Sequence, residues 1–469
     1  MNSKNLFSIL FCLIFFNSLA VNAKDNGALQ KFLGKKELAH AAVSLKAVDL
    51  TTGKAVVSYN EKMALTPASN MKLATTALAL DFLSEDFCYV TPLFYDGYIE
   101  DSTLCGNIFI RGTGDPSLGS EFTGEGADAL FEQWTSAVKN AGIKRIEGNV
   151  VILDQLFGYE GVSHKWLLED LGWYYGAPVF GISIFDNMCR IFFKSGNPGS
   201  PTEITGFSPQ IENLQFRNEI TASDVNDDES EIFGYPLDNV RVLKGKIPPF
   251  KENFVVKGDI PDPGSVLAEY FYNNLITKGI EITGQAVSYR TEPQLPTSEN
   301  LIFEHKSPKL SELAREINLH SNNNYAEHLY KRLARLDSID ASKYFQERGL
   351  DAGALFQCDG SGLSPQNAVS AGFLIELLIY MDKKYGRKGA FFQSLPIAGK
   401  EGTVASFLRN TPLSGKARLK SGSMSGVQAY SGYVETGSKR YAVSFIVNNF
   451  SGKRADLRKA MEELLAELF

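Results

Sequence analysis

Residues 66–75 read TPASNMKLAT, and this stretch holds the residue types of a nucleophile and its base, Ser69 and Lys72. Three residues apart is about one helical turn, so both side chains would leave the same face and could touch. A serine hydroxyl needs such a neighbour, because it is a weak nucleophile until a base takes its proton. The spacing alone decides nothing, since Ser136 and Lys139 in WTSAVKNAG repeat it.

The two pairs occupy different places in their predicted helices. Pro67 is typical of a first helical turn, and apolar residues from Met71 to Phe82 follow it on one stripe. Ser69 is therefore expected at a helix N-terminus, where backbone N–H groups are free. Ser136 lies inside the pattern ADALFEQWTSAVKNAG, where those groups are already bonded. We therefore take Ser69 and Lys72 as the candidate nucleophile and base.

Two further motifs would complete a site for acyl transfer, which also needs a proton donor and an oxyanion hole. Ser321-Asn322-Asn323 is an SxN triplet in a break between predicted helices, and Lys420-Ser421-Gly422 is a KSG triplet entering a predicted edge strand. Each is weak alone, because the mature chain repeats SxN at Ser58, Ser195 and Ser298, and KSG at 194–196. The ordered set of SxxK, SxN and KSG, each in its expected structural context, is far more specific.

The elements that must position these motifs come from both ends of the chain. Residues 41–60 read as strand, turn, strand, and residues 427–450 read as two more strands before a terminal helix. Residues 309–385 have helical periodicity. We expect an α/β (α+β) fold whose catalytic domain comprises residues 24–90 and 296–469. The short strands and glycine turns of residues 91–295 predict inserted, mainly-β domains.

The N-terminal residues predict export. Residues 1–23 contain Lys4, an apolar run and a small-residue ending, which is typical of a secretory signal peptide cleaved after Ala23. The apolar run is shorter than the ~20 residues that a transmembrane span needs. Loss of Lys4 would change the net charge from −7 to −8, or 46 basic against 54 acidic residues. A mildly acidic chain without a basic tract is not expected to bind nucleic acid.

The remaining cysteines and histidines give no sign of a metal or cofactor. If a disulfide forms, Cys88 with Cys105 closes the shortest loop, but free thiols, including Cys189 and Cys358, are favoured at least equally. The five histidines lack metal-ligand spacing and no CxxC occurs. We therefore expect no metal and no cofactor.

Over nearly its whole mature length the chain resembles the D-alanyl-D-alanine carboxypeptidases of the class C low-molecular-mass penicillin-binding proteins. Besides the three motifs, the resemblance rests on RGTGDPSL at 111–118, WYYGAPVFGISIFDN at 173–187, SNNNYAEHL at 321–329 and DGSGLSPQN at 359–367. The family also has a large insert between its first two motifs, and here Ser69 and Ser321 are 252 residues apart, 321 minus 69. Serine replaces the usual threonine at 421 and asparagine replaces the frequent aspartate at 322, which keeps the groups that the chemistry needs.

The resemblance implies a penicillin-recognising serine transpeptidase/β-lactamase-like fold, in which helices flank an antiparallel sheet. It implies a periplasmic enzyme that acts on peptidoglycan stem peptides as a carboxypeptidase, with or without endopeptidase action, and is acylated by β-lactam antibiotics. Any association with the membrane or cell wall would be peripheral, since no anchor is visible. The oligomeric state is not fixed by the sequence.

The resemblance also implies roles in acylation. Ser69 would attack the substrate carbonyl, and Lys72 would take its proton as a neutral amine. Burial and a second cation, Lys420, both disfavour the charged form of Lys72. The backbone N–H groups of Ser69 and Ser423 would form the oxyanion hole.

The other motif residues would handle the substrate and the leaving group. Ser321 would relay a proton to the leaving amine, and Asn323 would hold the base and the substrate amide. Ser421 and Ser423 would hydrogen-bond the terminal carboxylate, with Gly422 between them in the substrate-binding strand.

Two alternatives stay open. A β-lactamase or esterase would use the same acylation set but needs fast release of the acyl group, and no deacylating glutamate can be assigned. A catalytically silent cell-wall binding protein would keep the fold and lose turnover, which the complete motifs argue against.

Overall fold

The computed structural model describes residues 23–123, 126–290 and 296–469. The predicted signal peptide lies outside these ranges, apart from Ala23. No helix in the described residues is both long and apolar enough to cross a membrane. The helices are α1 (Ala23–Leu33), α2 (Met71–Leu83), α3 (Gly126–Asn140), α4 (Pro263–Thr277), α5 (Leu310–Leu319), α6 (Asn323–Lys331), α7 (Ala341–Gln346), α8 (Ala371–Tyr385), α9 (Ala390–Ser394) and α10 (Arg454–Leu468).

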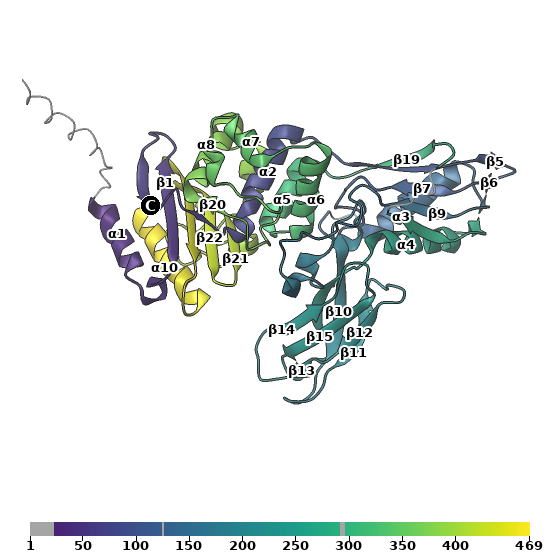
Figure 1. Ribbon diagram of the computed structural model, residues 1–469, viewed down its shortest axis with the longest axis horizontal. Helices are drawn as coiled ribbons and strands as arrows, with labels where there is room; N and C mark the ends of the chain where they lie inside the picture. Colours follow the sequence, from purple (N-terminus) through teal and green to yellow (C-terminus); the bar gives the residue numbers. More distant parts are fainter. Residues whose placement is uncertain (1–22, 124–125, 291–295) are drawn as a thin grey trace, which may run out of the picture.

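A five-stranded antiparallel sheet forms the part of the molecule on the left of Figure 1, in the order β2-β1-β23-β22-β21. Its strands are β1 (Ala42–Asp49), β2 (Ala55–Tyr59), β21 (Ala417–Met424), β22 (Val427–Thr436) and β23 (Lys439–Asn448). β1 pairs with β23 along its whole length, from Ala42 opposite Asn448 to Asp49 opposite Tyr441. Strands from the two ends of the chain thus form one sheet, and β21 lies at its edge.

Helices cover both faces of this sheet because successive side chains of a strand point to opposite sides. On β23, Phe445 packs in the cluster that also contains Phe32 of α1 and Leu464 of α10. Its neighbour Ile446 packs in the other cluster, with Leu78 of α2 and residues of α5, α6 and α8. The helix that carries the SxxK motif therefore lies against the sheet in an apolar core.

The insert occupies the right and lower parts of Figure 1. Its first part pairs β18-β9-β7-β4-β19 and β17-β8-β6-β5, and α3 and α4 share its apolar core. These strands are β4 (Val90–Tyr95), β5 (Tyr98–Glu100), β6 (Thr103–Cys105), β7 (Ile108–Arg111), β8 (Arg145–Ile146), β9 (Val150–Leu153), β17 (Glu281–Ile282), β18 (Ala286–Tyr289) and β19 (Asn300–Lys306).

The second part of the insert contains the seven strands from β10 to β16 and lies below the first part in Figure 1. Its strands are β10 (Met188–Lys194), β11 (Glu203–Ser208), β12 (Gln215–Asn218), β13 (Thr221–Ala222), β14 (Glu229–Phe233), β15 (Val240–Ile247) and β16 (Phe254–Asp259). Two short strands of the catalytic domain, β3 (Ala64–Leu65) and β20 (Val369–Ser370), pair with each other.

The chain enters and leaves the insert through two paired strands. β19 runs antiparallel to β4, with Lys306 opposite Val90 and Asn300 opposite Tyr95. Residues 300–306 therefore belong to the sheet of the insert, although the sequence boundary at 295 assigns them to the catalytic domain. On this pairing we place the end of the insert at Lys306.

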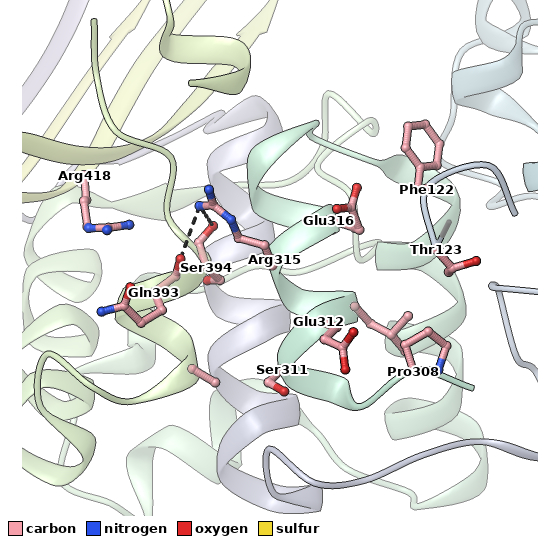
Figure 2. Close-up of a pocket in the computed structure, with 12 residues that line it drawn as sticks. Phe122, Thr123, Pro308, Ser311, Glu312, Arg315, Glu316, Gln393, Ser394 and Arg418 are labelled. Atoms are coloured by element: carbon pink, nitrogen blue, oxygen red, sulfur yellow. Dashed lines mark hydrogen bonds between the residues drawn. The ribbon is translucent and has the colours of Figure 1, made fainter. Parts of the chain in front are cut away.

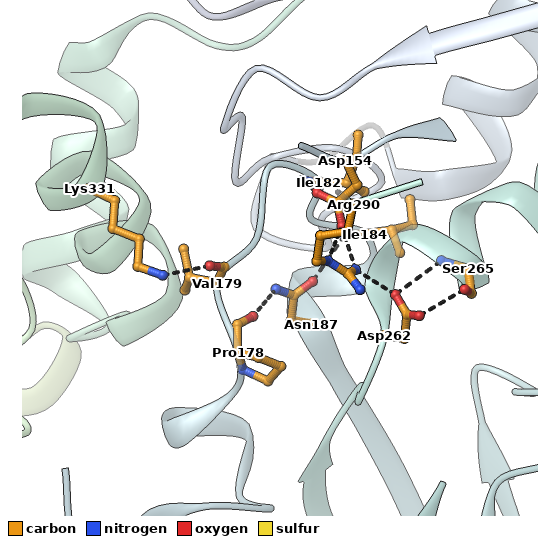
Figure 3. A network of polar contacts seen from close by, with 10 residues as sticks. All are labelled: Asp154, Pro178, Val179, Ile182, Ile184, Asn187, Asp262, Ser265, Arg290 and Lys331. Carbon is orange, nitrogen blue, oxygen red and sulfur yellow. Dashed lines mark hydrogen bonds and ion pairs between the residues drawn. The ribbon is translucent and has the colours of Figure 1, made fainter. Parts of the chain in front are cut away.

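A loop of the insert is fixed between α6 and the insert's own sheet, as Figure 3 shows. Lys331, the last residue of α6, donates to the carbonyl oxygen of Val179 at 2.7 Å. Three residues further on, the backbone N–H of Ile182 donates to Asp154 Oδ1 at 2.8 Å. Asp154 is in turn held by the Arg290 guanidinium, at 2.5 Å from its Oδ2. Buried polar contacts thus attach the insert to the catalytic domain.

All four cysteines in the described residues are free thiols. Cys189 is buried, while Cys88, Cys105 and Cys358 are partly exposed. The disulfide between Cys88 and Cys105 that the sequence left open is not formed.

Candidate active site

Ser69 and Lys72 are in direct contact, with 3.0 Å between Lys72 Nζ and Ser69 Oγ. Ser69 lies in a single turn of 3₁₀ helix, Ala68–Asn70, that leads directly into α2. Ala68 has a φ of 47°, a left-handed conformation that is unusual for alanine and marks a constrained turn. Lys72, in the first turn of α2, is 0% exposed. The chain thus places a partly exposed hydroxyl over a buried amine.

The other contacts of Lys72 are to neutral acceptors. Its Nζ donates to Asn323 Oδ1 and to the carbonyl oxygen of Ser361, each at 2.6 Å. Burial lowers the pKa of Lys72 to about 7, against the opposing effect of the Glu327 and Asp359 carboxylates. An appreciable fraction of neutral amine is therefore present near neutral pH, which a base requires.

Lys420 joins the third motif to the second. It is 0% exposed, and its Nζ donates to Ser321 Oγ at 2.9 Å and to the carbonyl oxygen of Ser421 at 2.8 Å. Burial and then the neighbouring Lys72 hold the pKa of Lys420 well below its usual range. The sequence predicts that burial and Lys420 both depress the pKa of Lys72. Burial is the cause that lowers it, and Lys420 is not among the groups that shift it.

The SxN triplet forms the connection between α5 and α6. Ser321 has a φ of 58°, and the side chain of Asn322 caps α6 by accepting a hydrogen bond from the backbone N–H of Tyr325 at 3.1 Å. Asn323 is then the first residue of α6, and its Nδ2 donates to the carbonyl oxygen of Tyr175 at 2.8 Å. Because Tyr175 belongs to the insert, the insert helps to orient the amide that holds Lys72.

Gly422 lets the edge strand β21 approach the start of α2. A Cβ at this position would lie 2.3 Å from the carbonyl oxygen of Pro67 and 3.2 Å from the backbone nitrogen of Ser69. Only glycine avoids that clash, because backbone atoms cannot move aside. The strand segment that carries Ser423 is thereby held beside the backbone of Ser69.

These side chains open into a cavity of about 710 Å³, which Ser69, Ser321, Asn323, Ser421 and Ser423 line. Lys72, Lys420 and Gly422 lie behind its wall. Other parts of the chain add to the lining: the insert supplies Leu167, Glu169, Asp170, Tyr174 and Tyr175, α10 supplies Arg454 and Arg458, and the loop before β21 supplies Thr403. The predicted site residues are thus brought together, and the cavity has an acidic wall and a basic wall.

Comparison with known proteins decides the family. The model of the D-Ala-D-Ala carboxypeptidase 3 (S13) family matches residues 25–468. The chain belongs to the S13 family. It is therefore a serine-type D-Ala-D-Ala carboxypeptidase with a penicillin-recognising fold, as the three motifs predict.

Named S13-like relatives are similar over most of their length. A D-alanyl-D-alanine carboxypeptidase, DacB, of Haemophilus influenzae is 27% identical over 91% of this chain and 91% of the relative. A D-alanyl-D-alanine carboxypeptidase of Actinomadura sp. is 26% identical over 88% of this chain and 78% of the relative. Among solved structures, penicillin-binding protein 4 of H. influenzae has a TM-score of 0.79 at 23% identity, covering 95% of this chain and 99% of that one. This last likeness shows the shared fold.

Sequence reasoning missed several residues of this S13 site. Glu327 and Asp359 are buried carboxylates near Lys72. Tyr175 contacts Asn323, and Thr403 contacts Ser421. A signal existed for Glu327, which lies four residues after Asn323 and hence on the same face of α6. For Asp359 the only signal was its place in DGSGLSPQN, a stretch noted for family resemblance alone.

A second groove, of about 510 Å³, adjoins the catalytic cavity and contains none of the predicted site residues. Figure 2 shows it across α5, with Phe122 of the insert on one side and Arg418 on the other. Glu316 lines this groove and lies 2.6 Å from Nδ1 of His320, which lines the catalytic cavity. The contact between His320 and Glu316 therefore lies where the groove meets the catalytic cavity, and His320 directly precedes Ser321 in the sequence.

Proposed function

We propose that this carboxypeptidase cleaves the terminal D-alanine from peptidoglycan stem peptides with Ser69 as nucleophile and Lys72 as base. The observation that carries the proposal is the buried Lys72 amine 3.0 Å from Ser69 Oγ, with its pKa lowered to about 7. As the Oγ–C bond forms, the hydroxyl proton passes to Lys72 Nζ. The backbone N–H groups of Ser69 and Ser423 stabilise the developing oxyanion, and each contributes typically ~3 kcal/mol.

Departure of D-alanine needs a proton on its amine. Ser321 Oγ, which is hydrogen-bonded to Lys420 Nζ, gives that proton as the C–N bond breaks, and Lys420 replaces it. The ammonium of Lys72 then returns a proton to Lys420, so both amines regain their starting states. Water attacks the carbonyl carbon of the acyl-enzyme ester and loses a proton to neutral Lys72, which passes it to Ser69 Oγ as the ester C–O bond breaks. These steps balance the protons without any further group.

The edge strand recognises the terminal carboxylate. Ser421 and Ser423 line the cavity with hydroxyls that can donate to it, and Thr403 Oγ1 lies 2.7 Å from Ser421 Oγ. A carboxylate entering here also favours the ammonium form of Lys420, because an opposite charge raises the pKa of an amine. Substrate binding would thus favour the charged form of Lys420.

Two further activities follow from the same acyl-enzyme. β-Lactams would acylate Ser69, and a solved H. influenzae relative is in complex with a β-lactam. Endopeptidase action on cross-links between D-alanine and a diamino acid would differ only in the leaving amine. The groove over α5 favours it, because this groove adjoins the cavity at His320, next to the predicted proton donor Ser321.

We further propose that the mature enzyme acts in the periplasm, which the predicted signal peptide and the proposed cell-wall substrate support. Fractionation of cells that express the full chain tests this: activity in the osmotic-shock fluid supports export, and activity only in the cytosol contradicts it.

The decisive experiment is labelling of the parent and Ser69→Ala proteins with a fluorescent penicillin, followed by peptide mass spectrometry. We expect one adduct on the peptide that contains Ser69 and none in the variant. Labelling of Ser69→Ala would overturn the nucleophile. Release of D-alanine from a pentapeptide ending in D-Ala-D-Ala tests turnover, and rapid loss of the penicilloyl adduct without such release would instead indicate a β-lactamase.

A further inference from the structure

Two carboxyl groups are buried behind the catalytic lysine. Glu327 is 3% exposed and Asp359 is 0% exposed, and neither lines the catalytic cavity. Both oppose the lowering of the pKa of Lys72 by burial, with Glu327 the stronger. Buried carboxyls are rare unless they are paired or functional. Their location next to the base calls for a role in its proton balance.

Glu327 is connected to Lys72 through one residue. Lys72 Nζ donates to the carbonyl oxygen of Ser361 at 2.6 Å, and the backbone N–H of Ser361 donates to Glu327 Oε1 at 2.7 Å. Asn323, which accepts directly from Lys72, lies one turn before Glu327 on α6. Both residues thus face the lysine from the same side of the helix.

The two carboxyl groups are stabilised very differently. Asp359 accepts from the backbone N–H groups of Gly362 and Ser364 at 2.7 and 2.6 Å, and from Asn367 Nδ2 and Trp166 Nε1 at 2.8 and 2.9 Å. Burial and then the charge of Asp359 raise the pKa of Glu327 to about 7. Glu327 therefore gains a proton near neutral pH.

A rear cavity gives Glu327 its own access to water. This space of about 250 Å³ lies between α6 and the insert, and Glu327, Tyr330 and Lys331 line it together with Trp166, Val179 and Cys358. A cavity of that size holds several water molecules. Lys72 does not line it. The titratable groups that face Glu327 are Asp359, Lys72, Tyr330 and Lys331.

We propose that Glu327 is a positioning residue that sets the proton occupancy of Lys72 from behind the active site and exchanges its own proton through the rear cavity. A charged Glu327 holds the proton on Lys72, and a neutral Glu327 releases it. When Ser69 gives its proton to Lys72, a charged Glu327 stabilises the new ammonium. The inference rests on the proposed role of Lys72 as base.

The test is the pH profile of acylation by a fluorescent penicillin, from about pH 5 to about pH 9. Glu327→Gln keeps an acceptor for the Ser361 N–H and removes the charge, so the pKa of Lys72 falls. We expect the midpoint of the acidic limb to move down by roughly one pH unit. The plateau at high pH should also fall, because a less basic amine takes a proton less readily. An unchanged midpoint would overturn the proposal.

Two comparisons separate charge from structure. Glu160→Gln alters the rim of the same rear cavity, where Glu160 pairs with Arg335, and should leave the midpoint in place. Glu327→Asp keeps the charge, so its midpoint should stay near that of the parent. Equal shifts in the Asp and Gln variants would assign the effect to packing and contradict the proposal.

A measurement on the parent protein covers the case in which Glu327→Gln does not fold. Carbon NMR of protein labelled at the glutamate Cδ should show one carboxyl that titrates near neutral pH and responds to acylation of Ser69. Absence of such a signal would refute the proposal. If Lys72→Ala is still acylated at the parent rate, the assigned base is wrong; if Lys72 is required but the profiles coincide, only the role of Glu327 fails.

Discussion

The insert and the catalytic domain both bury cationic side chains, but the groups that contact these side chains differ. Arg241 in the insert is 1% exposed and binds Asp259 through two contacts, Nε to Oδ1 at 2.6 Å and Nη2 to Oδ2 at 2.9 Å. Lys72 and Lys420 are buried as deeply, yet their Nζ atoms contact hydroxyl, amide and carbonyl oxygens. A carboxylate in direct contact keeps a buried cation charged. Burial without such a partner lowers the pKa of an amine, so that the amine can lose its proton. Burial alone therefore does not distinguish a structural cation from a catalytic one.

The largest expected effect is at Lys72, which has no carboxylate in direct contact. Lys72→Met should slow acylation by a fluorescent penicillin at least ~10³-fold, because the general base is lost. The thermal midpoint should stay the same or rise, because a desolvated ammonium without a direct carboxylate partner is replaced by an apolar chain of similar length. Labelling rates and thermal unfolding of the two proteins measure both effects. A midpoint several degrees lower would show that Lys72 is structural as well.

The same change at the paired cation should have the opposite outcome. Arg241→Met leaves the Asp259 carboxylate buried alone, so the free energy of unfolding should fall by about 3 to 5 kcal/mol. The acylation rate per folded molecule should not change. Denaturant unfolding followed by fluorescence measures the loss.

A matched control for Arg241 is Arg145→Met. Arg145 is 41% exposed and pairs with Glu281 and Glu147 on the surface of the insert. Such pairs contribute about 0 to 1 kcal/mol, so this variant should be close to the parent. Equal losses in the two variants would mean that burial does not set the strength of the pair.

The next effect concerns geometry rather than charge. Gly422→Ala should lower acylation roughly 10²-fold, because its Cβ pushes β21 from the turn at Ser69 and displaces an oxyanion donor. Gly206→Ala in β11 is the control, since a Cβ there meets no atom within 4 Å. Stopped-flow labelling gives both rates, and equal rates for the two variants would remove Gly422 from the site.

The smallest effect is the pH dependence of the parent. Acylation should fall about tenfold for each pH unit below the Lys72 pKa of about 7, and level off above it. Because this pKa is lower in the folded than in the unfolded state, the unfolded chain binds more protons between them. Stability conferred by Lys72 therefore rises with pH above about 7, and the parent should gain thermal stability relative to Lys72→Met in that range. A constant difference would contradict the lowered pKa.

Much of the catalytic domain was predictable from local patterns. The period of apolar residues predicts β1, α2 and β23, and motif order predicts that Ser69, Ser321 and Lys420 meet. Glu327 was not predicted, because its burial depends on the loop at Asp359, which no periodicity reports. The amide of Asn323 is held by Tyr175 from the insert, a contact that crosses 148 positions of sequence.

The sequence boundary at residue 295 differs from the observed strand pairing for a related reason. Residues 291–300 have the composition of a linker, but whether the following strand pairs with β4 or with another segment is a question of tertiary contact. Strand propensity names the element and leaves its partner open.

The paired strands β4 and β19 also change what the chain must do to bring its motifs together. Joining two points 252 residues apart, such as Ser69 and Ser321, costs roughly 5 kcal/mol of loop entropy. Once Val90 lies opposite Lys306, only 21 residues from Ser69 and 15 to Ser321 remain to be closed. That shorter loop lowers the cost by roughly 2 kcal/mol. A folded insert thus holds its two ends together through β4 and β19. The active site can then assemble as though a short loop joined its first two motifs.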